Sequence, residues 1–158
     1  MIKKLAFIGI LFLPILGFSQ TEKKDLGKLQ WWEDDKFGLF LHWGLYSATA
    51  GDWKGHKTSR GEQFMMVERI PVKEYATIAD TFNPVRFDAD KWVLMAKKAG
   101  MKYIVVTSKH HDGFAMYNSP SSDYNIVKKT PFKRDPMTEL SNACHKYGIK
   151  FGFYYSLG

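Results

Sequence analysis

The sequence is poor in cysteine and lacks the common nucleotide and nucleophile motifs. Cys144 is the single cysteine of the 158 residues, so no disulfide can form within the chain. It falls in a helical pattern, and we expect it to be a small buried hydrophobic side chain. The sequence contains no serine nucleophile elbow, glycine-rich phosphate loop, paired-cysteine zinc spacing or dinucleotide fingerprint. These absences argue against nucleotide chemistry and against a cysteine zinc site.

Runs of positive charge are also absent. The formal net charge is +7, but Lys3 and Lys4 belong to a predicted leader, and the remainder carries about +5. The other lysines and arginines are interspersed with aspartate and glutamate, for example in the segments KEY and DADKW. A scattered pattern of this kind is typical of solvated surfaces, so we expect no nucleic-acid partner.

A long apolar run occurs only at the amino terminus. Two lysines precede the apolar residues 5–18, and a cleavage point is expected after Ser19. This pattern predicts a signal peptide over residues 1–19, export to the periplasm or the extracellular space, and no stable membrane insertion after cleavage. An N-terminal membrane anchor is the alternative, although the run is short for a span. Residues 20–158 are enough for one domain with a hydrophobic core.

The clearest helix is predicted over residues 87–100. Asp88 is the expected N-cap, and Gly100 is suited to end the helix in a left-handed conformation. The apolar face of this helix is expected to consist of Trp92, Leu94, Met95 and Ala96. The β-branched run 101–108 follows directly and predicts a buried strand.

The same order recurs later in the chain. Asp135 is suited to cap a second helix, Pro136 suits its first position, and Gly148 follows its last turn. The segment 149–156 then predicts another strand, and an earlier apolar run at 37–43 predicts the first one. Alternating strands and helices indicate an α/β fold with a parallel sheet, and the apolar strands predict that both faces of the sheet are covered.

Two long loops and a third helix complete the expected organisation. Residues 47–61 are rich in glycine, serine and threonine, and residues 109–135 form the second loop. The third helix is expected over 70–82, started by Pro71. Loops at the carboxyl ends of parallel strands carry the ligand sites of barrels and open α/β sheets. Trp53 of the first loop is either an anchor for that loop or a stacking platform for a ligand.

Polar side chains stand at the end of each predicted strand. They are His42 after the first strand, His110 and His111 after the second, and Tyr154 and Tyr155 in the third. A βα repeat brings the carboxyl ends of parallel strands to one mouth, so we expect these side chains to converge. A neutral imidazole offers one hydrogen-bond donor and one acceptor, which suits the hydroxyl groups of a polyol.

Other interpretations of these residues stay open. A lone histidine such as His42 can equally be a core residue with a backbone partner, and a loop carboxylate such as Glu62 is most often a solvated surface group. Neighbouring side chains on an extended strand point in opposite directions, so His110 and His111 are poorly suited to bind one metal ion together. A metal site of His42, one of these two histidines and Asp112 is still geometrically possible.

Three segments are distinctive: FGLFLHWGLYS, SKHHDGF and YGIKFGFYYS. They closely resemble the amino-terminal third of the catalytic domain of glycoside hydrolase family 29 α-L-fucosidases, and the similarity runs from about Trp31 to the last residue. The resemblance implies the first three βα units of a (β/α)8-like (TIM) barrel, incomplete in this chain. It also implies retaining hydrolysis of terminal α-L-fucose from fucosylated glycans, with no cofactor and no metal.

By resemblance, the fucose-binding residues are His42, Glu62, His110, His111 and Tyr154. Tyr154 is preferred over Tyr155 because the family pattern keeps the first aromatic residue of this pair more strictly. One difference is Gln63, where the family often has tryptophan, so the pocket wall beside Glu62 is expected to differ.

The catalytic carboxylates that the family pattern implies fall outside these segments. The pattern puts the nucleophilic aspartate at the end of the fourth strand and the acid/base later still, beyond residue 158, and retaining hydrolysis needs both groups. We therefore expect no catalytic residue in this chain and no activity of the chain alone. The alternatives are a non-catalytic fucose-binding fragment and, from another class, a metal-dependent barrel hydrolase.

Overall fold

The computed structural model describes residues 27–157, so the predicted signal peptide and its cleavage point lie outside the described residues. Within that part of the chain, no helix has the length and apolar character needed to cross a membrane. The α-helices are α1 (Gln30–Asp35), α2 (Tyr46–Thr49), α3 (Phe64–Val67), α4 (Val72–Tyr75), α5 (Ala89–Lys98), α6 (Ile126–Lys129) and α7 (Pro136–Tyr147). The strands are β1 (Gly38–Leu41), β2 (Asp52–Trp53), β3 (His56–Lys57), β4 (Tyr103–Lys109) and β5 (Lys150–Tyr155). Three 3-10 helices are η1 (Gly27–Leu29), η2 (Gly61–Gln63) and η3 (Ala76–Asp80).

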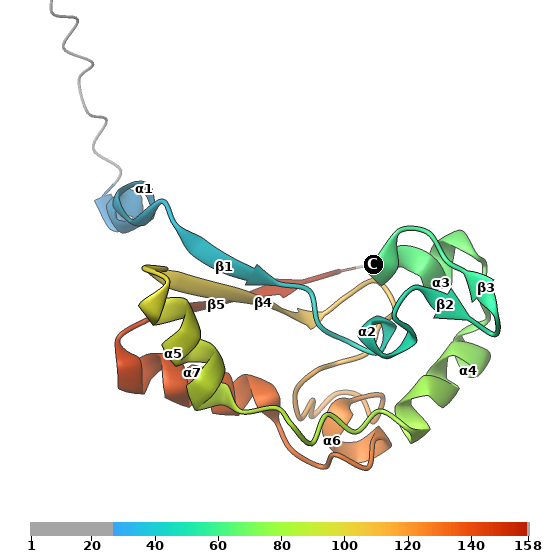
Figure 1. Ribbon diagram of the computed structural model, residues 1–158. Helices are drawn as coiled ribbons and strands as arrows, with labels where there is room; N and C mark the ends of the chain where they lie inside the picture. The colour runs from blue at the N-terminus through green and yellow to red at the C-terminus, as the bar shows by residue number, and fades with distance from the viewer. Residues whose placement is uncertain (1–26, 158) are drawn as a thin grey trace, which may run out of the picture.

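Three strands form a parallel sheet in the order β1, β4, β5 (Figure 1). Gly38 of β1 pairs with Tyr103 of β4, and Tyr103 pairs in turn with Lys150 of β5. Helices α5 and α7 lie side by side on one face of this sheet. The short elements from α2 to α4 gather beyond the carboxyl ends of the strands. The predicted α/β fold with a parallel sheet is confirmed.

The centre of the sheet is buried, whereas its edges are not. Ile104 and Val106 of β4 have no exposed surface and belong to the same core as Val93 of α5. Phe40 of β1 and Phe153 of β5 are 52% and 55% exposed. The expectation of a sheet covered on both faces is therefore wrong for the described part of the chain, in which α5 and α7 lie together on one face of the sheet.

Helix α5 begins and ends as expected, but it is rotated relative to the expected face. The Asp88 carboxylate accepts the backbone N–H of Lys91 at 3.0 Å, and Gly100 follows the helix with a φ of +84°. The buried residues of α5 are Ala89, Val93 and Ala96. Met95, expected in the core, is 64% exposed, because it lies two positions after Val93 and so points to the other side of the helix.

Helix α7 matches its predicted boundaries. One carboxylate oxygen of Asp135 accepts two backbone N–H groups of the first turn, each at 3.0 Å, and Gly148 ends the helix with a φ of +68°. Cys144 is 1% exposed, as expected of a small core residue. Burial raises the pKa of its thiol to about 11, so this cysteine is a poor nucleophile.

The two predicted loops contain more structure than expected. Residues 47–61 include an antiparallel hairpin in which Trp53 of β2 pairs with His56 of β3. The predicted helix over 70–82 starts directly after Pro71, but it changes from α4 to the tighter η3 at Ala76. Residues in short turns of this kind are positioned by packing, which sequence periodicity does not report.

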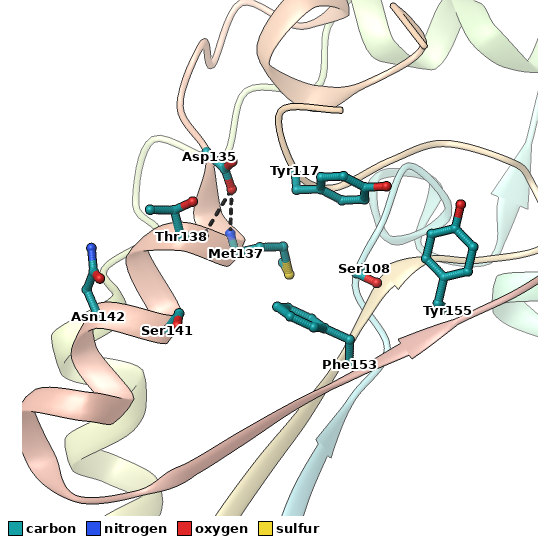
Figure 2. A pocket seen from close by; sticks show the side chains of 9 residues that line it. All are labelled: Ser108, Tyr117, Asp135, Met137, Thr138, Ser141, Asn142, Phe153 and Tyr155. Atoms are coloured by element: carbon teal, nitrogen blue, oxygen red, sulfur yellow. Dashed lines mark hydrogen bonds between the residues drawn. The ribbon is translucent and has the colours of Figure 1, made fainter. Parts of the chain in front are cut away.

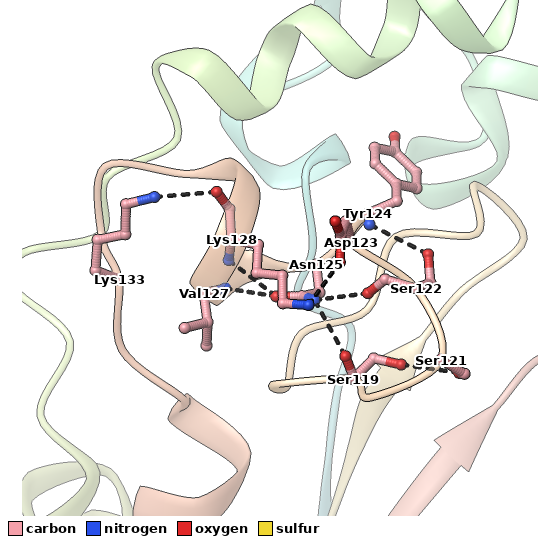
Figure 3. Close-up of polar contacts among 9 residues, drawn as sticks. All are labelled: Ser119, Ser121, Ser122, Asp123, Tyr124, Asn125, Val127, Lys128 and Lys133. Atoms are coloured by element: carbon pink, nitrogen blue, oxygen red, sulfur yellow. Dashed lines mark hydrogen bonds and ion pairs between the residues drawn. The ribbon is translucent and has the colours of Figure 1, made fainter.

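The segment between β4 and α7 is ordered around one amide side chain (Figure 3). Asn125 has no exposed surface, and its oxygen accepts the backbone N–H groups of Val127 and Lys128, each at 3.0 Å. Its amide nitrogen donates to the carbonyl oxygens of Ser122 and Ser119, at 2.7 and 3.5 Å. Asn125 thus caps α6 and closes the preceding turn, so the expected long loop is instead a folded segment.

Candidate functional site

The carboxyl ends of the three strands bring three rings together. His42 directly follows β1, His110 directly follows β4, and Tyr154 lies near the end of β5. The ring of His110 lies 5.3 Å from His42 and 5.4 Å from Tyr154, measured between centroids, and it is stacked on the tyrosine at 25°. Phe40 adds an apolar surface 4.8 Å from His42. The predicted convergence of the strand ends is therefore observed for these residues.

Glu62 joins the two histidines although it comes from η2, in the segment after the hairpin. One nitrogen of His42, one nitrogen of His110 and one carboxylate oxygen of Glu62 all lie within 4.8 Å of one another. His42 is exposed, Glu62 is half-buried and His110 is 4% exposed. The cluster therefore runs from the solvent into the protein, and Glu62 is not merely a solvated loop carboxylate.

His111 lies next to His110 rather than on the opposite side of the sheet. The two ring centroids are 4.6 Å apart and the planes meet at 86°. The expectation that these side chains diverge is wrong, because β4 ends at Lys109 and its register against β5 shifts just before that residue. Nδ1 of His111 shares a hydrogen bond of 2.7 Å with the hydroxyl of Ser156, the residue after β5.

The two tyrosines at the end of β5 face different surroundings. Tyr154 faces the histidines, with its ring centroid 6.2 Å from that of His42. The ring of Tyr155 lies 4.5 Å from Nζ of Lys109 and contributes to a cavity beside α7. Strand alternation explains this division between the two neighbours.

Asp112 does not belong to the cluster of His42, Glu62 and His110. It is 5% exposed, and its two carboxylate oxygens accept the hydroxyl of Tyr75 at 2.9 Å and the backbone N–H of Phe114 at 3.1 Å. Burial raises the pKa of this carboxyl, and the two hydrogen bonds oppose that effect. The alternative metal set that used Asp112 is therefore wrong.

The surroundings of His110 favour the neutral form of its imidazole. Burial lowers its pKa below the ordinary 6.5, the neighbouring His111 and His42 lower it further, and the charge of Glu62 opposes them. Its Nδ1 is buried and has no hydrogen-bond partner among residues 27–157. An unpaired buried nitrogen is costly, so this atom would gain from a ligand or a water molecule.

Two supporting residues gave no signal in the sequence. Tyr46 packs edge-on against His110 at 5.6 Å, and its hydroxyl bonds to that of Thr107 at 2.9 Å. Thr107 also accepts the N–H of Trp43 at 3.0 Å and donates to the Trp43 carbonyl oxygen at 3.1 Å. Within the sequence, Thr107 is only one of several β-branched residues of a strand. Its role depends on the neighbouring strand, which local patterns do not identify.

Trp53 acts as an anchor of its loop. Its ring lies 5.8 Å from Phe64 and 6.5 Å from Tyr75, and it is half-buried. Of the two roles considered for Trp53, packing within the loop is the one that these contacts support.

A cavity of about 460 Å³ lies elsewhere, between α7 and β5 (Figure 2). Its lining includes Met137, Phe153 and Tyr155. The Asp135 carboxylate at its rim already accepts backbone N–H groups of α7 and the N–H of Asn118. Asp135, the one carboxylate in the lining of this cavity, is thus engaged in capping α7. The lining contains none of the residues of the histidine cluster.

Known proteins similar to this chain are α-L-fucosidases. A family model described as Alpha-L-fucosidase matches residues 18–158. Tissue alpha-L-fucosidase of Bos taurus is 37% identical over 135 residues, which are 80% of this chain and 29% of the bovine protein. A putative alpha-L-fucosidase of Caenorhabditis elegans is 38% identical over 161 residues, covering 94% of this chain and 33% of the nematode protein. The chain thus spans about a third of the length of these relatives.

Solved structures give the same result. Alpha-L-fucosidase AlfC from Lactobacillus casei, in complex with its α-L-fucose product, is 50% identical with a TM-score of 0.78, covering 80% of this chain and 40% of that one. The enzyme from Vibrio sp. strain EJY3 is also 50% identical, with a TM-score of 0.77 over 79% of this chain and 22% of that one. The resemblance found in the sequence is confirmed, and this chain belongs to the α-L-fucosidase family.

Proposed function

We propose that this chain carries the fucose-binding part of an α-L-fucosidase pocket, within the first three βα units of a (β/α)8-like barrel. The binding residues are His42, Glu62, His110, His111 and Tyr154. The observation that carries the proposal is the cluster of His42, Glu62 and His110 beside the ring of Tyr154. The whole protein would hydrolyse terminal α-L-fucose from fucosylated glycans with retention of configuration.

The spacing of the cluster suits a hydroxyl oxygen. An oxygen that makes hydrogen bonds of about 2.8 Å in tetrahedral directions holds its partners about 4.6 Å apart. The three atoms of His42, Glu62 and His110 lie within 4.8 Å of one another, which accommodates such an oxygen. The same upper limit also accommodates Zn²⁺, which with bonds of about 2.0–2.1 Å holds its ligands about 3.4 Å apart, so spacing alone does not choose between the two ligands.

The surroundings suit a sugar that is polar on its edges and apolar on one face. Neutral imidazoles both donate to and accept from hydroxyl groups, and a carboxylate accepts from them. Tyr154 and Phe40, whose ring centroids are 6.0 Å apart, offer apolar surface beside these polar atoms. The fucose complex of the 50%-identical Lactobacillus casei enzyme supports the same class of ligand.

The residues at this edge of the sheet suit recognition better than bond cleavage. Retaining hydrolysis uses one carboxylate as nucleophile and a second as acid and base. Asp112 is directed into the protein toward Tyr75, and Glu62 lies among the histidines. We therefore propose that other parts of the barrel supply the catalytic pair, and that residues 1–19 direct export of the protein to the periplasm or the extracellular space.

A metal-dependent hydrolase is the second candidate. Two histidines and one glutamate form a ligand set that catalytic zinc sites use, and His42, Glu62 and His110 have this composition. Exposure of His42 would leave a coordination position open to solvent. The family relationship favours the fucose site over this alternative.

Replacement of His110 by alanine should weaken binding of L-fucose by about tenfold or more, because a buried hydrogen-bonding group of the cluster is lost. Titration of the chain with L-fucose, followed by NMR, measures this change. His145→Ala is the matched control, since His145 is an exposed histidine of α7. Equal affinity of His110→Ala and the unchanged protein would contradict the assignment.

An aryl α-L-fucoside should not be turned over by this chain alone, because the proposed catalytic pair lies elsewhere in the barrel. Release of the phenol measures turnover, with and without added Zn²⁺. Steady release without metal would refute the proposal that the catalytic carboxylates are supplied elsewhere. Release that requires one bound zinc per chain, and that is lost in His42→Ala, would favour the metal-dependent hydrolase.

The stability of the protein should decrease as the pH falls below about 6.5, the ordinary pKa of histidine. The unfolded chain binds a proton at His110 near that pH, whereas the folded protein, with its lowered pKa, does so only at lower pH. Between these two pKa values the unfolded state holds more protons than the folded state, so the free energy of unfolding decreases as the pH decreases. Urea unfolding at several pH values should find a weaker dependence in His110→Gln than in His145→Gln. Identical slopes in the two variants would disprove this origin.

A further inference from the structure

We propose that the hydrogen bond between Tyr75 and Asp112 is a positioning contact that holds the Glu62 segment and the histidine turn at the correct separation. This inference rests on the proposed function for the identity of its ligand, L-fucose. It concerns two residues that lie behind the site. Both are positioning residues, because their polar atoms are engaged with each other and with the backbone rather than with a bound sugar.

Asp112 fixes the turn that directly follows the two histidines. One of its oxygens accepts the backbone N–H of Phe114 at 3.1 Å, and the N–H of Gly113 donates to the carbonyl oxygen of His110 at 3.0 Å. Gly113 has a φ of +75°, a conformation that favours glycine. The turn is therefore tight, and a shift of the Asp112 carboxylate would be transmitted to His110 and His111 over one or two peptide units.

Tyr75 fixes the segment that carries Glu62. It is fully buried at the end of α4, and its ring centroid lies 5.3 Å from Phe64 and 6.5 Å from Trp53. Phe64 follows η2, which contains Glu62, and Trp53 belongs to the hairpin before it. The ring of Tyr75 thus packs on one segment of the site, while its hydroxyl donates to the Asp112 carboxylate of the other at 2.9 Å.

The two halves of this contact are buried, so its loss cannot be compensated easily by solvent. Asp112 is 5% exposed and Tyr75 is 0% exposed. A buried carboxylate that loses a hydrogen bond tends to move toward another donor or toward water. Either movement would change the distance between Glu62 and His110, on which simultaneous contact with one hydroxyl depends.

Tyr75→Phe tests the inference, because it removes the hydroxyl and keeps the ring that packs on Phe64. Tyr124→Phe is the matched control: it removes the buried hydroxyl of a half-buried tyrosine, and that hydroxyl has no hydrogen-bond partner among the described residues. We expect L-fucose to bind Tyr75→Phe about tenfold more weakly and Tyr124→Phe as tightly as the unchanged protein. Thermal unfolding of both variants confirms that they are folded at the temperature of the titration.

The NMR signals of the imidazole rings give a readout that does not depend on fucose. We expect the His110 and His111 signals to move in Tyr75→Phe and to stay in place in Tyr124→Phe. Neither tyrosine hydroxyl bonds to an imidazole, so a moved signal would report a displaced histidine turn rather than the loss of a direct hydrogen bond. Unmoved signals together with unchanged fucose affinity in Tyr75→Phe would overturn the inference. Failure of the unchanged protein to bind fucose would instead overturn the proposed function, while the imidazole signals still test the positioning contact.

A second variant separates this contact from a general loss of stability. In an Asp112→Ala background, Tyr75→Phe should reduce fucose affinity by less than twofold, because the acceptor of its hydrogen bond is already gone. A full tenfold additional loss in that background would contradict the coupling between the two residues. If Tyr75→Phe does not fold, Asp112→Asn and Asp112→Ala test the same contact, because Asp112→Asn retains one acceptor oxygen and Asp112→Ala retains none. Weaker fucose binding by Asp112→Ala would support the contact, and equal affinities of the two variants would count against it.

Discussion

The site depends on the parallel alignment of β4 between β1 and β5. This arrangement brings the ends of three strands to one edge of the sheet, where His42, His110 and Tyr154 meet. Thr107 reinforces the alignment at the point where it matters most, because one hydroxyl bonds both backbone groups of Trp43, the residue after His42. The histidine of the first strand is thereby held to the second strand by a side chain as well as by the sheet.

Hydrogen bonds between the residues next to the histidine rings explain how a small sheet can carry a polar site. Beside the histidines, Ser156 bonds to His111 and Asp112 bonds to Tyr75, so both of these polar pairs are satisfied by a partner from another segment. The site itself contains the exposed ring of His42 and the buried ring of His110, whose Nδ1 has no hydrogen-bond partner among residues 27–157. Satisfied polar groups outside and unsatisfied groups inside are what a site for a hydroxylated ligand requires.

Local sequence signals identified the elements whose formation depends on local physics. The caps at Asp88 and Asp135 and the β-branched run of β4 were recognisable because capping and strand preference act over a few residues. The exposed position of Met95 was not predicted, because the rotation of a helix is decided by what packs on it. The hairpin within residues 47–61 was also missed, since its short strands carry no periodic pattern.

The site residues divide in the same way. His42 and His110 could be located because each follows an apolar strand, whereas the preference for Tyr154 over Tyr155 came from the family resemblance. The proximity of Glu62 to the histidines was predicted from the family resemblance alone. The path of the Glu62 segment is set by packing between Phe64 and Tyr75, which are distant from each other in the sequence, so no local pattern reports it. The relative orientation of the two adjacent histidines was predicted wrongly, because the extended conformation was assumed to continue past Lys109, where β4 ends.

A crystal structure of this chain with bound L-fucose tests the central claim most directly. The account predicts that one hydroxyl oxygen of the sugar lies within hydrogen-bond distance of His42, Glu62 and His110, with the sugar beside the ring of Tyr154. Fucose in the cavity between α7 and β5, or no sugar at the histidine cluster at saturating concentration, would contradict it.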